Sequence, residues 1–200
     1  MKRLVAVACV LCLAAGARAQ EKVPPEMAQR FAKLFVGQAA KETDVPFKAD
    51  ADPTKAVALK HGDAHAMVIP AKDLSEDALG KAGKEVVPVG QLWLRHLVPN
   101  LEGKQTSEDQ LRIVHVEVNN QDHPLPLLLL GVRKGADGPE LVVYGKGKDV
   151  LAHLPLKKVD NKQDEPIDLG AKDVQEGTGT LVVTILGKWQ ADLPVAGAQK

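Results

Sequence analysis

The sequence predicts a mainly β protein: an antiparallel β-sandwich, or a curled sheet, with an N-terminal amphipathic helix and one short second helix. From residue 85 onward, short strand-like segments with alternating apolar residues follow one another, and turns rich in Gly, Asn and Asp separate them. Parallel strands need connections of about a dozen or more residues, and most connections here are shorter, so antiparallel pairing is expected.

The first 19 residues have the three parts of a secretory signal peptide. Lys2 and Arg3 precede an apolar run over residues 4–15, and an A-x-A pattern ends at Ala19. Cleavage is therefore expected after Ala19, and the product is expected to be secreted or periplasmic. An uncleaved membrane anchor is the alternative, but the apolar run is shorter than the roughly 20 residues of a spanning helix. No membrane span is expected in the mature form.

Both cysteines of the chain, Cys9 and Cys12, fall inside this segment, so the mature protein is expected to be free of cysteine. Disulfides, thiol nucleophiles and cysteine metal sites are then excluded. The whole chain has 26 basic and 26 acidic residues, and loss of Lys2, Arg3 and Arg18 leaves 23 basic against 26 acidic, a formal charge of −3. This mild acidic balance, without clustered Lys and Arg, argues against a nucleic-acid partner.

Residues 20–44 are expected to contain the N-terminal helix, ahead of a single β-rich domain at 45–196 and a frayed tail at 197–200. Large apolar residues of this helix recur at helical spacing, which places them on one stripe. They are Met27, Phe31, Leu34 and Phe35. The stripe is expected to pack on an apolar surface of the main domain, and the alternative is a helix that docks on a membrane surface or another chain.

The second helix is expected in the segment DLSEDALGKAG, residues 73–83. Asp73 is the predicted N-cap, Glu76 its capping-box partner and Gly83 the stop signal. Gly80 weakens this helix, because glycine has a low helix propensity.

Strands account for most of the remaining chain. They are expected at residues 55–60, 65–70, 85–89, 91–98, 110–118, 125–132, 140–145, 150–156, 179–186 and 188–195. The runs LLLL at 127–130 and LVVTIL at 181–186 are apolar on both faces, so their strands are expected to lie centrally. In the last strand Trp189 is in phase with Ala191 and Leu193, which places it on the core side.

The stretch HGDAH places His61, Asp63 and His65 at two-residue intervals. On one continuous strand these side chains would share a face and could ligate zinc. However, Gly62 and Asp63 suit a two-residue hairpin turn, and a glycine inside a strand weakens that strand. The hairpin is the interpretation we favour. It pairs His61 with Ala64 and points the two histidines to opposite sides of the ribbon.

A second group of polar residues, His115, Glu117 and His153, provides candidates for a metal site. The valines of RIVHVEV take the buried phase, which leaves His115 and Glu117 together on the other face, and His153 likewise lies opposite the apolar phase of its strand. If these strands are neighbours, the three side chains could hold a metal for hydrolysis. The alternative, which we favour, is a set of solvated cross-strand contacts. No metal or other cofactor is therefore expected.

Nucleophiles and phosphate loops are scarce. Ser75 and Ser107 are the two serines of the chain, and neither lies in a G-x-S-x-G elbow. The glycine-containing segments GKGKD and EGTGTL lack the spacing of a P-loop or a dinucleotide fingerprint. These observations favour a protein without catalytic activity.

The predicted function is that of an exported, non-catalytic β-sandwich protein that binds a protein or polymer in the cell envelope. Trp93 and Arg95 share a strand face and form the predicted binding surface. One alternative is a metal-assisted hydrolase that uses His115, Glu117 and His153. The other is a structural envelope protein that docks through its N-terminal helix.

Overall fold

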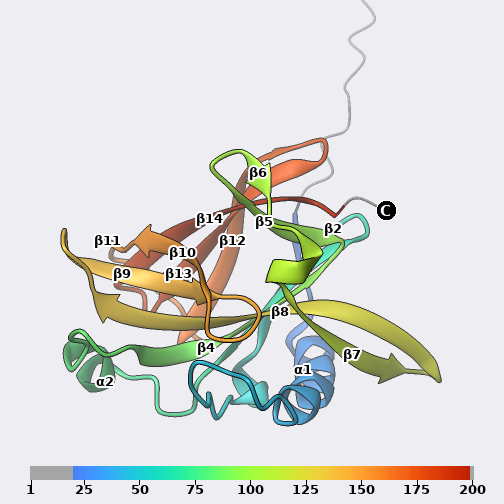
Figure 1. The fold of residues 1–200 in the computed structure, drawn as a ribbon, viewed down its shortest axis with the longest axis horizontal. Coiled ribbons are helices and arrows are strands. Elements are labelled where there is room, and N and C mark those ends of the chain that lie inside the picture. The colour runs from blue at the N-terminus through green and yellow to red at the C-terminus, as the bar shows by residue number, and fades with distance from the viewer. Residues whose placement is uncertain (1–19, 199–200) are drawn as a thin grey trace, which may run out of the picture.

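Two antiparallel sheets stacked face to face form most of the structure, a computed structural model that describes residues 20–198 (Figure 1). This arrangement confirms the predicted antiparallel β-sandwich. The predicted signal peptide, its cleavage after Ala19 and the cysteines Cys9 and Cys12 lie outside the described residues. Within residues 20–198, no helix is long and apolar enough to cross a lipid bilayer.

The first sheet has eight strands in the order β1-β2-β3-β4-β8-β9-β10, with β7 paired to β8 outside this path. Its strands are β1 (Glu21–Lys22), β2 (Val57–His61), β3 (Ala64–Pro70), β4 (Val87–Arg95), β7 (Arg112–Val118), β8 (Gln121–Lys134), β9 (Pro139–Tyr144) and β10 (Val150–Pro155). The long strand β8 pairs with β4 along one edge and with β7 and then β9 along the other. The predicted central position of the run at 127–130 is therefore confirmed.

The second sheet has six strands in the order β12-β13-β14-β5-β6, with β11 paired to β14. They are β5 (Leu97–Leu101), β6 (Lys104–Gln105), β11 (Lys157–Lys158), β12 (Ile167–Gln175), β13 (Thr178–Ile185) and β14 (Trp189–Gly197). β5 comes from the middle of the chain, but its partner is the last strand, and Val98 pairs with Ala196. The single strand predicted at 91–98 is wrong. His96 has a left-handed backbone (φ 55°), and at this residue the chain leaves the first sheet for the second.

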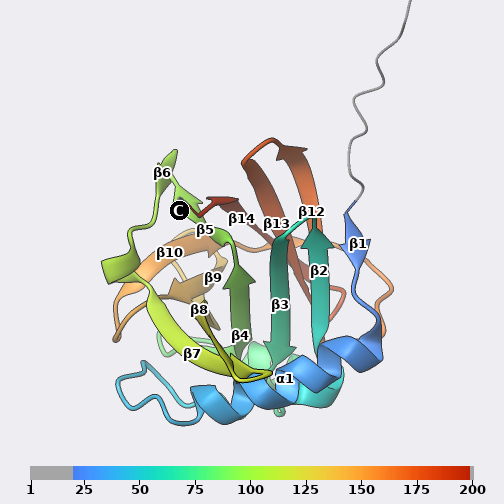
Figure 2. The same cartoon turned by 90° about the vertical axis from the view of Figure 1, so that its right-hand side faces the viewer.

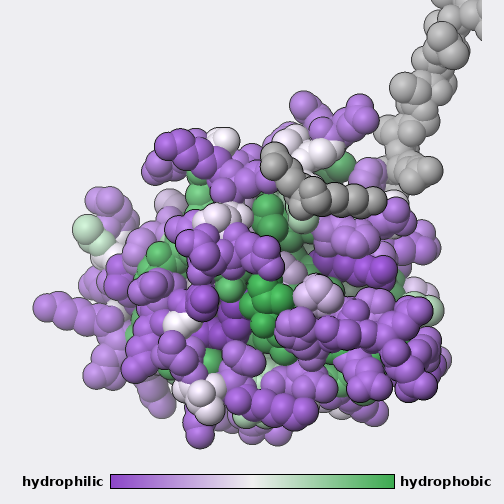
Figure 3. All heavy atoms as spheres, turned by 45° about the vertical axis from the view of Figure 1, so that its right-hand side comes forward, coloured by the Kyte–Doolittle hydropathy of each residue, from purple (hydrophilic) through white to green (hydrophobic). Residues whose placement is uncertain are grey.

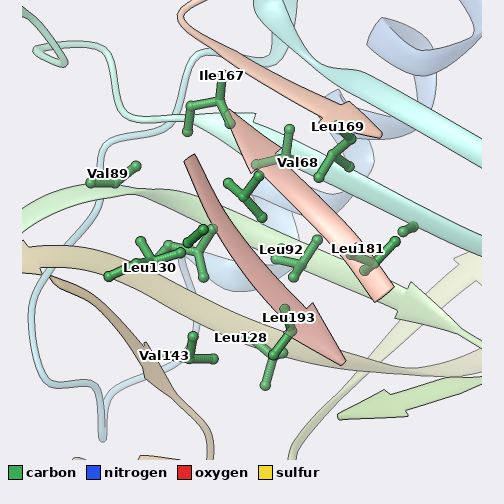
Figure 4. Close-up of a cluster of buried hydrophobic side chains, with 14 of the residues drawn as sticks. Val68, Val89, Leu92, Leu128, Leu130, Val143, Ile167, Leu169, Leu181 and Leu193 are labelled. Carbon is green, nitrogen blue, oxygen red and sulfur yellow. The ribbon is translucent and has the colours of Figure 1, made fainter. Parts of the chain in front are cut away.

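The space between the sheets is filled by apolar side chains from both inner faces. Figure 4 shows Val68, Leu92 and Leu128 of the first sheet facing Leu169, Leu181 and Leu193 of the second. All of these side chains are buried. Because successive residues of a strand point to opposite faces, their sequence neighbours emerge on the outer face of the first sheet.

The outer face of the first sheet is also apolar, and the helix α1 (Pro25–Ala39) covers it. Figure 2 shows α1 running across β2, β3 and β4. Ala28, Ala32 and Phe35 of the helix pack in one buried cluster with Met67 and Trp93 of the sheet. The rings of Phe35 and Trp93 are 4.7 Å apart between centroids. The first sheet is thus buried on both sides here, which explains why the run LLLL at 127–130 is apolar on both faces.

The side of α1 that contacts the sheet differs from the predicted stripe. Met27 is 50% exposed and Leu34 44% exposed, so these two residues are not part of the packed side. Ala28 and Ala32 are buried instead. Small side chains allow the helix backbone to lie close to the sheet, which favours the alanine side over a side with longer apolar residues. The helix is also shorter than the predicted segment 20–44, because residues 21–22 form β1.

The second helix, α2 (Glu76–Gly80), begins later than predicted. Ser75, not Asp73, is its N-cap, since the Ser75 hydroxyl accepts the Ala78 N–H at 3.2 Å. Glu76 is then the first residue of the helix instead of a capping-box partner, and the helix ends before Gly83.

The C-terminal half of the chain contains a long strand that was not predicted, and its tail is shorter than predicted. No strand is predicted at 167–175, yet β12 forms there. The expected frayed tail at 197–200 is wrong for its first two residues. Gly197 pairs with Leu97, and Ala198 N–H donates to the main-chain oxygen of His96 at 3.1 Å.

A buried arginine connects β7 to two loops. Arg112 is 4% exposed, and its Nη2 donates to the main-chain oxygens of Asp44 and Gly147, both at 2.7 Å. Its Nε lies 3.7 Å from a carboxylate oxygen of Glu42. Burial lowers the pKa of Arg112, and the charges of Glu42 and Asp44 oppose this effect. The side chain therefore links the segment after α1 with the β9–β10 connection.

The surface is mixed in character. Most of the face drawn in Figure 3 is hydrophilic, but hydrophobic side chains reach the surface near its centre. Scattered apolar side chains are normal on a folded protein, so a binding site has to be sought in concave regions as well as in surface hydropathy.

Candidate functional site

A cavity of about 640 Å³ lies at one end of the sandwich, beside α2. Four segments that are distant in the sequence surround it: α2 with the residues after it, the β8–β9 hairpin, residues 156–160, and the turn between β13 and β14. Ligand pockets typically measure roughly 300–1,000 Å³, so this cavity has the size of a small-molecule site.

The lining of the cavity is mainly apolar. Leu79 and Ala82 come from α2 and the residues after it, Leu156 precedes β11, and Leu186 lies in the turn before β14. Trp189, the first residue of β14, also lines the cavity and is half-buried. Contact between these side chains and the apolar part of a ligand would remove apolar surface of both from water.

Charged residues surround this apolar lining. Arg133, Lys134, Lys158 and Lys188 line the cavity together with two acidic residues, Glu76 and Asp160. The Lys188 ammonium lies 2.5 Å from a carboxylate oxygen of Glu76 and so joins the β13–β14 turn to α2. The Lys158 ammonium lies 5.7 Å from the centre of the Trp189 ring, within the range of a cation–π contact.

Arg133 belongs to a polar cluster that extends away from the cavity. Its Nε donates to Oε1 of Glu140 at 2.6 Å, and His153 Nδ1 lies 3.0 Å from the same oxygen. Burial alone would raise the pKa of Glu140, but the hydrogen bond from Arg133 and the charges of His153 and Arg133 lower it below its usual value. Glu140 is therefore a carboxylate at neutral pH and compensates the charge of Arg133.

The three residues considered for a metal site do not come together. His115 and Glu117 are both exposed on β7, as predicted, and His115 Nδ1 contacts Asp122 at 2.6 Å. His153 lies on β10 and contacts Glu140 instead. Among residues 20–198, no three His, Cys, Asp or Glu side chains are grouped closely enough to hold a metal ion. His115 and Glu117 on β7 and His153 on β10 are therefore not brought together as one ligand set, since His115 contacts Asp122 and His153 contacts Glu140.

The surface predicted at Trp93 and Arg95 is only partly exposed. Arg95 is exposed, but Trp93 is 2% exposed, and its Nε1 donates to Oε1 of Gln91 at 3.1 Å. The prediction that Trp93 forms an exposed platform is wrong. Its strand face is covered by α1, and alternation along a strand does not distinguish a face covered by a helix from one in water.

The hairpin predicted at Gly62 and Asp63 is confirmed. His61 pairs with Ala64, and Gly62 has the left-handed conformation that such a turn requires (φ 58°). His65 Nδ1 contacts the main-chain oxygen of Asp63 at 3.0 Å, and burial lowers the pKa of His65. His61 lines a second, smaller cavity of about 130 Å³ at the opposite end of the sandwich.

Both serines have structural partners. Ser75 caps α2, and the Ser107 hydroxyl donates to Oε1 of Gln110 at 2.9 Å in the turn before β7. Both side chains therefore have structural roles, one in a helix cap and one in a turn.

The residues around the larger cavity were not identified by sequence reasoning, except that Trp189 was expected on the core side. Lys134, Lys158 and Lys188 fall in connections or at strand ends, where lysine is common and carries no specific signal. Comparison of the chain with models of protein families, with characterised proteins and with solved structures found no match.

Proposed function

We propose that this chain is an exported, non-catalytic binding protein whose ligand enters the cavity beside α2. The observation that carries this proposal is the 640 Å³ cavity with its apolar lining and its half-buried tryptophan, Trp189. The ligand is a small molecule or the end group of a polymer, because a cavity of this volume accommodates a group of that size.

Export, the absence of catalysis and binding at the cavity are each supported by a separate observation. Export rests on the signal-peptide pattern of residues 1–19. The absence of catalysis rests on the sequence, which has no nucleophile elbow or phosphate loop, and on the structural roles of Ser75 and Ser107. Binding at a concave apolar site agrees with the general preference of ligands for such surfaces.

A cavity-filling substitution tests the binding site. Residues 20–200 are screened against small molecules by ligand-observed NMR, and each binder is then titrated into the Ala82→Trp variant. Ala82 lines the cavity, so a tryptophan there is expected to abolish binding. The control is Ala40→Trp, because Ala40 is exposed at the end of α1. If binders are absent, or retain their affinity for the Ala82→Trp variant, the proposed site is wrong.

Export is tested separately by mass spectrometry of the protein recovered from its natural host. An N-terminus at Gln20 is expected, and a full-length chain in the cytoplasm would contradict this part of the proposal.

A second candidate function is docking through the outer side of α1. Met27 and Leu34 are seven residues apart and exposed, and the exposed Arg30 and Lys33 lie between them. Such a combination of apolar and basic side chains is found in helices that lie on membrane surfaces. Flotation of residues 20–200 with anionic liposomes is expected if α1 has this role. Absence of flotation, or equal flotation of the Met27→Gln/Leu34→Gln variant, would contradict it.

A further inference from the structure

The charges around the cavity beside α2 indicate which class of ligand it takes. We infer that the cavity binds an amphiphile with an apolar body and an anionic end group. This inference rests on the proposed function and specifies the ligand of the same site.

The apolar body is indicated by the floor of the cavity. Leu79, Leu156, Leu186 and Trp189 contribute side chains to it, and polar groups make up the smaller part of the lining. Burial of a flexible hydrocarbon chain against such side chains removes apolar surface from water on both partners. A fully polar ligand would lose hydration there without regaining hydrogen bonds.

The anionic end is indicated by cations at the rim that lack a partner. Lys188 is compensated by Glu76 on the opposite side of the opening. In contrast, no carboxylate of residues 20–198 lies within ion-pair distance of Lys134 or Lys158. Lys134 ends β8, and Lys158 ends β11, where its ammonium lies over the Trp189 ring. An anion at the mouth would meet two ammonium groups without an ion pair to the described residues and one carboxylate, Asp160, so the positive charge there exceeds the negative.

The rest of the molecule does not share this charge balance. The cavity lining has four cations against two carboxylates, whereas residues 20–200 have 23 basic against 26 acidic residues. The smaller cavity provides a comparison within the same fold. Its lysine, Lys60, is compensated by Glu21 at 3.1 Å. Of the four cations of the larger cavity, Arg133 and Lys188 are paired with Glu140 and Glu76. The two lysines without an ion pair within residues 20–198, Lys134 and Lys158, therefore distinguish the larger cavity, and they favour an anionic ligand.

Three probes with the same hydrocarbon chain separate the two parts of the ligand. Decanoate, decanol and decylammonium are titrated into residues 20–200 by isothermal titration calorimetry, below the concentration at which they form micelles. Decanoate is expected to bind more tightly than decanol, and decanol more tightly than decylammonium. The affinity for decanoate is expected to fall as the salt concentration rises, because salt screens the rim charges.

The rim lysines are tested by the double variant Lys134→Gln/Lys158→Gln. Each exposed ion pair contributes modestly, so decanoate is expected to bind about threefold to tenfold more weakly to this variant, and decanol with unchanged affinity. The matched control is Lys104→Gln/Lys148→Gln, which removes the same charge from exposed positions outside the cavity. Circular dichroism and thermal unfolding check that both variants fold, which is expected because all four side chains are exposed.

The outcomes distinguish this inference from the proposed function. If decanol binds as tightly as decanoate, or if the control variant weakens decanoate as much as the rim variant does, the anionic end group is wrong and the cavity remains a binding site. If none of the three probes binds and the small-molecule screen also yields nothing that the Ala82→Trp variant loses, both are wrong.

Discussion

Replacement of Arg112 by methionine is expected to lower the free energy of unfolding by about 3 kcal/mol. A hydrogen bond from a charged donor contributes about 1.5–3 kcal/mol, so the two bonds to Asp44 and Gly147 give roughly 3–6 kcal/mol as an upper range. The loss is expected at the lower end. The Nη1 atom of Arg112 is buried without a partner, and removal of the charge recovers its cost of desolvation. Methionine keeps most of the aliphatic packing of the arginine stem.

Urea denaturation followed by circular dichroism measures this loss. The comparison requires that the free energy of unfolding falls with urea concentration at the same slope in the wild-type protein and in the Arg112→Met variant. The matched control is Arg95→Met on β4, a strand of the same sheet. Arg95 is exposed and has no ion pair within the described part of the chain, so a change within about 0.5 kcal/mol is expected. If Arg112→Met lowers the free energy of unfolding by less than about 1 kcal/mol, the two hydrogen bonds do not hold the loops as described.

Four other substitutions test the fold and the cavity. Burial alone would raise the pKa of Asp192, but Lys172 lowers it, so Asp192→Asn is expected to cost about 1 kcal/mol of unfolding free energy at pH 7. Urea denaturation at several pH values should show this difference shrink as the pH falls below the unfolded-state pKa of about 4, where the carboxylate becomes protonated. A Cβ at Gly90 would lie 2.4 Å from a main-chain oxygen of β3, so Gly90→Ala is expected to cost about 1–3 kcal/mol, whereas Gly37→Ala in α1, with open space around it, should stabilise the protein in thermal unfolding. Lys188→Gln is expected to weaken decanoate less than the Lys134/Lys158 double variant does in the same calorimetric titration, because the charge of Lys188 is already compensated.

The sequence predicted features that depend on a residue and its immediate neighbours. The hairpin at Gly62 follows from a turn dipeptide between two apolar runs, and the buried valines of β7 follow from strict alternation. β12 was missed because only its first half alternates clearly. Ile167 and Leu169 are buried, but the residues from Lys172 onward are all exposed.

Features that depend on the packing of distant segments were not predictable in this way. The phase of β4 identifies the face on which Trp93 lies, but the burial of that face depends on α1, which is more than fifty residues away in the chain. The cavity depends on the packing of distant segments even more than the burial of Trp93 does. Leu79, Leu156 and Trp189 belong to segments that have no common local pattern, and they meet only because α2 lies at the end of the two sheets.

The pairing of β14 with β5 has a consequence for how the protein reaches its native state. β5 pairs with β14, so the second layer closes only after residues 189–197 have been synthesised. Contacts between such distant segments slow folding. A product that ends before Trp189 would present open edges on β5 and β13 at the same time, and unpaired edges of this kind recruit other chains into aggregates.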